Sequence, residues 1–152
     1  MNPNSAGGVY YENRILTASP QRLQFLLLDA ALTSARKAEE FLMAQSPLHA
    51  GTELARAETI LTEIVGSFRR DLAPELVDRA SAVYVFTLQA LTDAHLTDDL
   101  RRLRDGLRVL EVEHETWRLA AEQTAEKRQS APAPHMSFDS SASLQGGFTL
   151  EA

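Results

Sequence analysis

A chain of 152 residues, 44% hydrophobic and 24% charged, has the size and composition of one globular domain and is unlike a fibrous protein. Its formal net charge of −6, with arginines interleaved among acidic residues, argues against nucleic-acid binding, which needs a dense basic surface. The absence of cysteine excludes disulfides, thiolate metal ligands and cysteine catalysis.

The sequence also argues against membrane insertion and secretion. Apolar runs such as Phe25–Leu28 fall far short of the roughly 20 residues that a transmembrane helix needs. Residues 1–8 carry neither the basic residues nor the apolar stretch of a signal peptide. We therefore expect the protein to work in the cytoplasm.

The N-terminal segment, residues 1–18, has no regular hydrophobic period, yet it is more apolar than a free tail usually is. Its apolar side chains are Tyr10, Tyr11, Ile15 and Leu16. We expect this segment to cap the rest of the protein.

The first helix is predicted to begin at Ser19 and Pro20. A serine caps the free amide groups of a helix start, and a proline at the first helical position loses no hydrogen bond. The helical pattern continues to about Ala44, and Pro47 is expected to end it.

Three further helices follow from the positions of proline, of capping residues and of apolar side chains. A second helix is predicted from near Thr52 to Asp71, because its apolar residues recur at three- and four-residue steps. Pro74 opens a third helix, which runs to about His95, and the 97–99 segment caps a fourth that extends to about Arg128.

Short connections between these helices predict an all-α fold, an antiparallel up-down four-helix bundle. Residues 129–152 are rich in serine, glycine, alanine and proline, which is typical of a linker and a disordered tail. We therefore divide the chain into an N-terminal cap segment (1–18), a helical bundle domain (19–128) and a disordered tail (129–152).

No motif in the sequence indicates catalysis. Glu111 and His114 have the Glu-x-x-His spacing of di-iron bundles, but a second such pair is missing. The chain also lacks a glycine-rich phosphate loop and the exposed mid-helix histidine of phosphotransfer bundles. We predict a protein that is not an enzyme and that has no metal and no cofactor.

The informative feature is an excess of apolar residues on two of the predicted helices. In the first helix they are Leu23, Phe25, Leu26, Leu27, Leu28, Ala30, Ala31 and Leu32. In the third helix they are Ala80, Ala82, Val83, Tyr84, Val85, Phe86, Leu88, Ala90 and Leu91. The second and fourth helices have the single apolar stripe of an ordinary bundle helix.

Apolar residues nearly all round a helix leave surface that a small bundle cannot cover. The N-terminal segment, a second copy of the chain, or a client peptide in a groove could each cover it. Alternatively, these two helices pack more deeply and the N-terminal segment is a permanent lid.

The N-terminal stretch carries a resemblance to a known family. Residues 10–20 read Tyr-Tyr-Glu-Asn-Arg-Ile-Leu-Thr-Ala-Ser-Pro, and a leucine run ending at Asp29 follows. Together with a single tryptophan late in the last helix, Trp117, this resembles the FliS family of flagellin chaperones over roughly residues 10–125. The family's Leu-Tyr-Asp-Gly motif departs here, because Leu28 and Ala30 replace the tyrosine and the glycine.

The resemblance implies a cytoplasmic bacterial export chaperone. Such a protein would bind the disordered C-terminal segment of flagellin, prevent its premature polymerisation and assist its delivery for flagellar secretion. The residues that match the family, and so are expected to form the lid and the flagellin-binding helix, are Tyr10, Asn13, Ile15, Thr17, Leu23, Leu26, Leu27 and Asp29. Further groove candidates, chosen from apolar excess alone, are Val83, Phe86, Leu110 and Trp117, although a core position is favoured for Trp117.

Two alternatives stay open from the sequence. The bundle could be a non-enzymatic adaptor or regulatory dimer of the flagellar export system, with a groove that serves dimerisation or another export component. The apolar points of the tail, such as Phe138 and Phe148, could also occupy the chaperone's own groove, although plain disorder of the tail is favoured by its composition.

Overall fold

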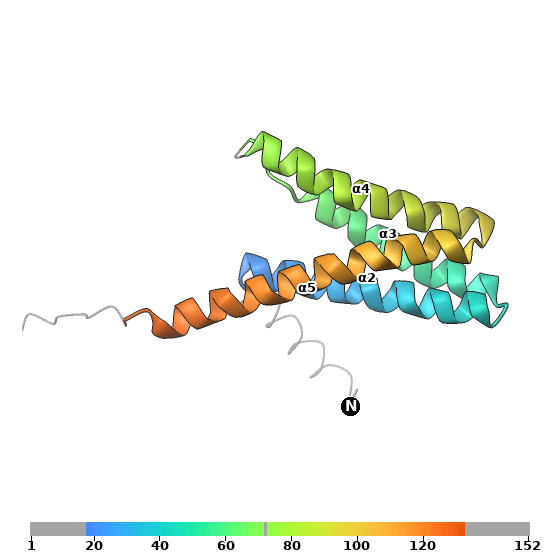
Figure 1. The fold of residues 1–152 in the computed structure, drawn as a ribbon, viewed down its shortest axis with the longest axis horizontal. Helices are drawn as coiled ribbons and strands as arrows, with labels where there is room; N and C mark the ends of the chain where they lie inside the picture. The colour runs from blue at the N-terminus through green and yellow to red at the C-terminus, as the bar shows by residue number, and fades with distance from the viewer. Residues whose placement is uncertain (1–17, 72, 133–152) are drawn as a thin grey trace, which may run out of the picture.

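A computed structural model describes residues 18–71 and 73–132 of the chain. These residues form four helices and contain no strand: α2 (Pro20–Met43), α3 (Pro47–Gly66), α4 (Pro74–Thr97) and α5 (Leu100–Ser130). The predicted all-α four-helix bundle is thereby confirmed (Figure 1). The predicted N-terminal cap segment and most of the predicted tail lie outside the described residues.

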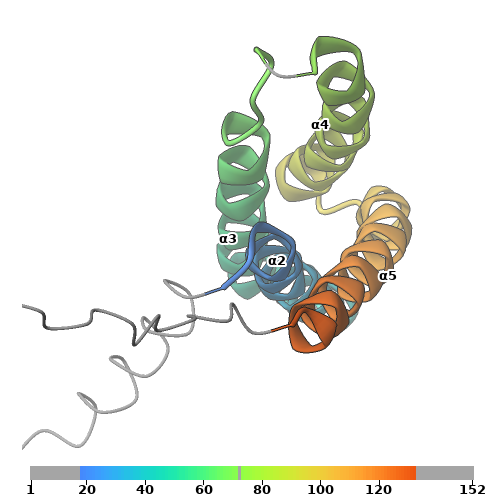
Figure 2. The same cartoon turned by 90° about the vertical axis from the view of Figure 1, so that its left-hand side faces the viewer.

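The helices run up and down in sequence order, and each packs beside its neighbours in the chain. Helix α2 packs against α3 and α5, and α4 packs against the same two helices from the diagonal position (Figure 2). Short connections at one end, residues 44–46 between α2 and α3 and residues 98–99 between α4 and α5, enforce this antiparallel order.

Side-chain caps and prolines set most of the helix starts. The Ser19 hydroxyl accepts a hydrogen bond from the backbone N–H of Arg22 at 3.1 Å, as predicted for the start of α2. The Asp99 carboxylate does the same for α5, accepting from the N–H groups of Arg101 and Arg102. Prolines occupy the first turn of α2, α3 and α4, where a missing N–H costs nothing.

The predicted boundaries of the second helix are wrong at both ends. Helix α3 begins at Pro47, five residues before the predicted start at Thr52, because a proline that stops one helix can also open the next. It ends at Gly66 and not at Asp71, where the Ser67 hydroxyl bonds to the carbonyl of Ile64 at 2.7 Å. Glycine is a poor helix residue, so the chain leaves the helix there.

The core runs from the end of the bundle with the connections 44–46 and 98–99 to Ile64, near the end of α3. Its large buried members are Leu28, Leu32, Leu54, Leu61, Ile64, Tyr84, Leu91, Leu103, Leu107 and Leu110. In contrast, none of residues 74–83 at the start of α4 is buried, and Ala121 is the one buried residue between 111 and 130 of α5. We call the end with the connections 44–46 and 98–99 the closed end, and the end with the start of α4 the open end.

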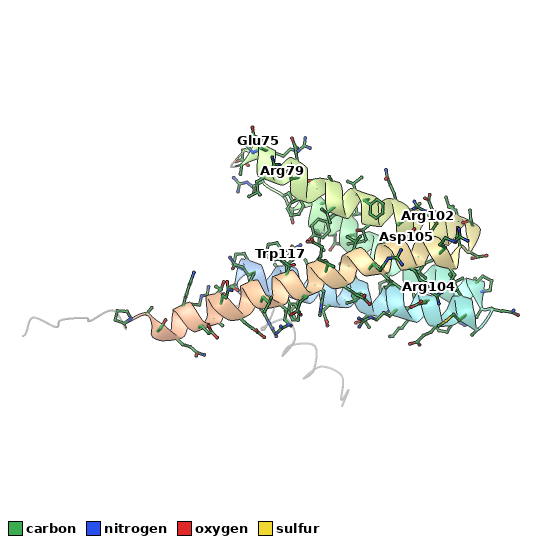
Figure 3. The ribbon with its side chains drawn as sticks, viewed as in Figure 1. Glu75, Arg79, Arg102, Arg104, Asp105 and Trp117 are labelled. Carbon is green, nitrogen blue, oxygen red and sulfur yellow. The ribbon has the colours of Figure 1, made fainter. Side chains whose placement is uncertain are left out.

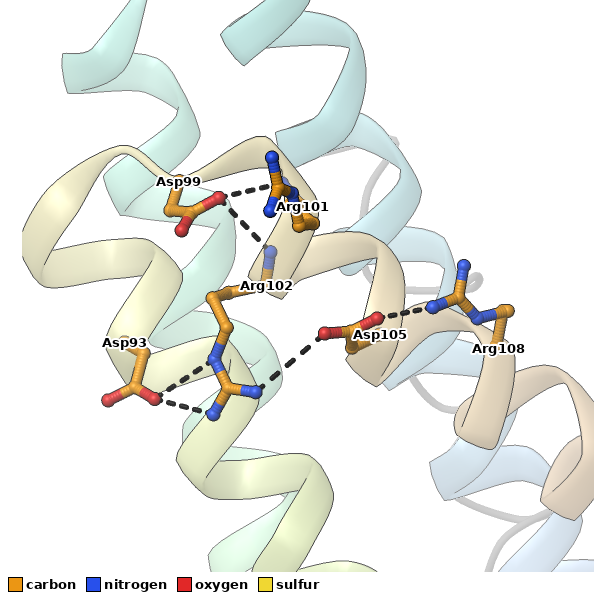
Figure 4. A network of polar contacts seen from close by, with 6 residues as sticks. All are labelled: Asp93, Asp99, Arg101, Arg102, Asp105 and Arg108. Carbon is orange, nitrogen blue, oxygen red and sulfur yellow. Dashed lines mark hydrogen bonds and ion pairs between the residues drawn. The ribbon is translucent and has the colours of Figure 1, made fainter.

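Polar side chains link α4 to α5 at the closed end (Figure 4). The guanidinium of Arg102 in α5 bonds twice to the carboxylate of Asp93 in α4, at 2.6 and 3.1 Å. The same guanidinium lies 3.7 Å from Asp105, which also pairs with Arg108. These pairs hold the two helices together beside their connection.

Over the part of the chain that the structure describes, no helix has the length and apolarity needed to cross a membrane.

Candidate functional site

The open end leaves apolar side chains of α4 without a cover. Leu76 is 68% exposed, and Ala80 and Val83 of the next two turns are partly exposed. A hollow of about 470 Å³ surrounds Leu76, lined by Ala73, Pro74, Glu75 and Arg79. Figure 3 shows Glu75 and Arg79 at the start of α4, well apart from Trp117 on the side of α5 that faces α4.

A buried hydroxyl marks the boundary between this open end and the core. Tyr84 of α4 is 2% exposed, and its hydroxyl bonds to side chains of two other helices. It accepts from the amide of Gln24 in α2 at 3.2 Å and from the indole N–H of Trp117 in α5 at 3.1 Å. It donates to the Glu113 carboxylate at 2.9 Å. One hydroxyl therefore ties together α2, α4 and α5.

The electrostatics of this hub keep the hydroxyl protonated. Burial raises the pKa of Tyr84 well above its ordinary value, and the negative charge of Glu113 raises it further. The hydrogen bonds from Gln24 and Trp117 act in the opposite direction. Because the proton stays on the tyrosine, the hub has a donor for Glu113 at neutral pH.

A second hollow, of about 440 Å³, lies between the start of α2 and the last turns of α5. Ala18, Ser19 and Arg22 line it from α2, and small side chains such as Ala121 and Ala125 line it from α5. Ala18 is the first residue that the structure describes, and the segment predicted to act as the lid precedes it in the sequence.

Contacts between α2 and α5 lie one to two turns further along α2. The carboxylate of Asp29 lies 2.8 Å from Nε2 of His114, and the ring of Phe25 lies 4.9 Å from the ring of the same histidine. The predicted binding residue Asp29 is exposed, and in this structure it bonds to α5.

The other predicted site residues of α2 lie partly at the surface. Leu23, Leu26 and Leu27 are each partly exposed, and Leu27 packs against the core. The predicted lid residues Tyr10, Asn13, Ile15 and Thr17 lie outside the described residues.

The groove candidates of α4 and α5 separate into accessible and inaccessible side chains. Val83 is partly exposed and Phe86 is 44% exposed, whereas Leu110 is fully buried. Leu110 therefore belongs to the core, because it shares the inward stripe of α5 with Leu103 and Leu107. Trp117 packs against the core and keeps partial exposure.

Sequence reasoning missed the polar partners of Tyr84. Gln24 is buried in α2, although its side chain is polar. The signal for it is its position four residues before Leu28, on the inward stripe of the helix. Glu113 carries the same signal, because it lies three residues after the buried Leu110.

Among the described residues no cluster of three or more histidine, aspartate and glutamate side chains has the arrangement of a metal site. The glutamate and histidine of the Glu-x-x-His spacing are engaged elsewhere. Glu111 pairs with Arg36 of α2 at 3.2 Å, and His114 contacts Asp29.

Known proteins place this bundle among flagellar proteins. A crystal structure of a flagellar chaperone from bacteria superposes on the chain with a TM-score of 0.63. The match covers 78% of this chain and 96% of the other at 21% sequence identity, so it supports the fold. No curated protein sequence matches the chain. The sequence family described as flagellar protein FliS matches residues 2–124, most of the chain, and the chain therefore belongs to the FliS family.

Proposed function

We propose that this protein is a flagellar export chaperone that binds the disordered C-terminal segment of flagellin in the bacterial cytoplasm. Binding would keep flagellin from polymerising before its export and assist its delivery for secretion. Membership in the FliS family supports the chaperone role, and the crystal structure of a bacterial flagellar chaperone with a similar fold agrees with it.

The observation that carries this proposal is the open end. The first ten residues of α4, 74–83, include Leu76, Val77, Ala80 and Val83, yet none of them is buried. An apolar helix face that the bundle leaves uncovered suits an amphipathic client helix, whose side chains at three- and four-residue steps fit such a groove.

Tyr84 and its partners give the site a rigid edge. The hub fixes the middle of α4 to α2 and α5, so the half of α4 before Tyr84 extends from an anchored point. A disordered client loses conformational entropy when it binds. A binding surface that is already fixed adds no further loss of entropy of its own.

The lid residues Tyr10, Asn13, Ile15 and Thr17 are part of the same proposal. The hollow beside Ala121 is lined by Ala18 and Ser19, the first residues that the structure describes. We propose that the lid segment before them covers part of the binding surface and shifts when flagellin arrives.

The test is a calorimetric titration with the C-terminal segment of flagellin from the same organism, with circular dichroism on the same samples. We expect saturable binding and a gain in helix. Leu76→Asp should weaken binding by about 2 kcal/mol, roughly thirtyfold in Kd, because burial of one leucine contributes about that much.

Leu96→Asp is the matched control. Leu96 lies on the same helix and is 78% exposed, but it sits at the closed end. We expect this variant to bind flagellin like the unmodified protein. If both variants bind equally well, the open end is not the site; if soluble flagellin segment gives no heat and no added helix, the flagellin assignment is wrong and the adaptor remains.

A further inference from the structure

We infer that the outward face of α5 is a self-complementary surface through which two copies of this chain associate, with the two α5 helices antiparallel. The inference concerns a different surface from the client site and does not depend on flagellin binding. It rests on the order of charges along this face and on two exposed apolar side chains within it.

The outward face of α5 changes sign along its length. Its first half carries Arg101, Arg104 and Arg108, which are all exposed and lie within one stripe because they are three and four residues apart. Its second half carries Glu115 and Glu122, whose side chains are 55% and 57% exposed. A helix with one basic and one acidic half repels a parallel copy and attracts an antiparallel one.

Apolar side chains lie on the same face where the charges change sign. Val112 is 64% exposed and Leu119, two turns further on, is 44% exposed. A hollow of about 560 Å³ runs beside Val112 and is lined by Arg108, Glu111, Glu115 and Thr116. Contacts between helices commonly have an apolar centre and a charged rim. Val112 between charged flanking residues follows this arrangement.

One antiparallel register pairs the basic half of the face with its acidic half. With the two-fold axis beside Val112, Arg108 faces Glu115 of the second copy and Arg101 faces Glu122 of the second copy. Arg104 then lies opposite Leu119 of the second copy, so both charged pairs of this register have opposite signs. The two valines meet near the axis, and each salt bridge occurs twice by symmetry.

Within a single chain these charges are only partly engaged. Arg108 pairs with Asp105, and Arg118 pairs with both Glu115 and Glu122, all on α5 itself. The Arg108 side chain stays 71% exposed. Charged groups that are exposed in this way can pair across an interface without the cost of removing a buried partner.

The first experiment is sedimentation of the full chain over a range of concentrations and salt. We expect a reversible monomer–dimer equilibrium that weakens as ionic strength rises, because exposed charges at this interface are screened by salt. Arg108→Glu alone and Glu115→Arg alone should each weaken the dimer by roughly tenfold, since each places like charges opposite one another twice.

Mixing the two variants separates this interface from any other. An Arg108→Glu chain and a Glu115→Arg chain present opposite charges to each other at both contacts, so the mixture should recover dimer that neither variant forms alone. A defect in folding or in the pairs along α5 would not be repaired by mixing.

A crosslinking experiment tests the register directly. The chain has no cysteine, so Val112→Cys places a single thiol beside the proposed axis. A short bis-maleimide should join two Val112→Cys chains and should leave Leu48→Cys chains, which carry the thiol at an exposed site on α3, unjoined.

Three results would overturn the inference. The first is a chain that stays monomeric at every concentration. The second is a dimer that ignores both charge reversals and disappears with Leu76→Asp, which would place the contact at the open end. The third is a monomer that binds a poly-glutamate peptide through Arg108, which would assign the basic half to an acidic partner.

Discussion

Leucines of the same helix, α4, differ in burial between the two ends of this bundle. At the closed end Leu91 of α4 is fully buried and touches α5 where Gly106 lets the helices approach. At the open end Leu76 of the same helix is 68% exposed. The difference teaches that burial along α4 stops at Tyr84: toward the closed end its inward leucine packs against α5, whereas none of residues 74–83 is buried.

The connections between the helices account for much of this difference. At the closed end residues 44–46 and 98–99 bring consecutive helices together at once, and the Arg102–Asp93 pair holds α4 beside α5. At the open end residues 67–73 form a longer connection between α3 and α4, and the start of α4 stands away from α5 (Figures 1 and 2). Among the described residues the start of α4 is tied to the rest of the bundle by the ion pair of Arg70 with Asp78 at 2.9 Å, and both of these side chains are largely exposed.

The sharpest test of the comparison is a pair of leucine truncations on α4. Leu91→Ala should lower the free energy of unfolding by about 3 kcal/mol, because it opens a cavity in a packed core. Leu76→Ala should change it by less than about 0.5 kcal/mol, because that side chain is already exposed. Urea unfolding of both variants, followed by circular dichroism, measures the two values.

Equal costs for these two substitutions would mean that both leucines are buried in the free protein. In that case the open end would already be covered, and the permanent-lid alternative would hold.

The boundary between the two ends can be tested at Tyr84. Tyr84→Phe keeps the ring and removes the hydroxyl, which leaves Gln24, Glu113 and Trp117 without their shared partner. We expect a loss of about 2 kcal/mol in the free energy of unfolding. The fluorescence of Trp117, the single tryptophan, should change as its indole N–H loses its acceptor.

The same variant has a signature in pH. The pKa of Tyr84 is higher in the folded protein than the ordinary value of about 10, so its stabilising effect is full below that pH. As pH rises above about 10 the unfolded chain loses the proton first, and the folded state loses this advantage. The stability gap between the unmodified protein and Tyr84→Phe should therefore narrow at alkaline pH; Tyr10 and Tyr11 are present in both proteins and cancel. A constant gap would show that the hydroxyl is not buried in the hub.

The smallest expected effects are at the two capped helix starts, one at each end. Ser19→Ala at the open end and Asp99→Ala at the closed end each remove a side-chain cap, worth about 1 kcal/mol. Thermal unfolding should show a similar loss for both, because each cap is local to its helix. A much larger loss for one variant would mean that this cap also anchors a neighbouring segment.

The helices could be predicted from the sequence because their signals are local. Proline and capping residues mark the starts of α2, α4 and α5, and the apolar stripes Leu54–Ile64 and Leu103–Leu110 are the buried faces of α3 and α5. The ends of the third and fourth helices differ from prediction by only two residues, since helix ends are variable by nature. The start of α3 differs from prediction because Pro47 both ends α2 and opens α3.

The candidate site could be predicted only in part, because its geometry depends on contacts between distant residues. Apolar excess on α2 and α4 indicated uncovered surface, but not which turns of α4 would stay without a buried residue. The Tyr84 hub joins Gln24 and Glu113, 60 and 29 residues away in sequence, and no local pattern predicts such pairing. Leu110 was misplaced because an apolar residue on a stripe looks the same whether it lines a groove or fills a core.

The unburied start of α4 also has a consequence for the lifetime of the protein. A segment without a fully buried side chain opens more easily than the packed core and is then open to proteolysis. Under the proposed function, a bound client would cover this part of α4. Because the client binds the folded state, a higher client concentration would stabilise the segment more. Degradation of the empty chaperone would then match its abundance in the cell to the amount of flagellin awaiting export.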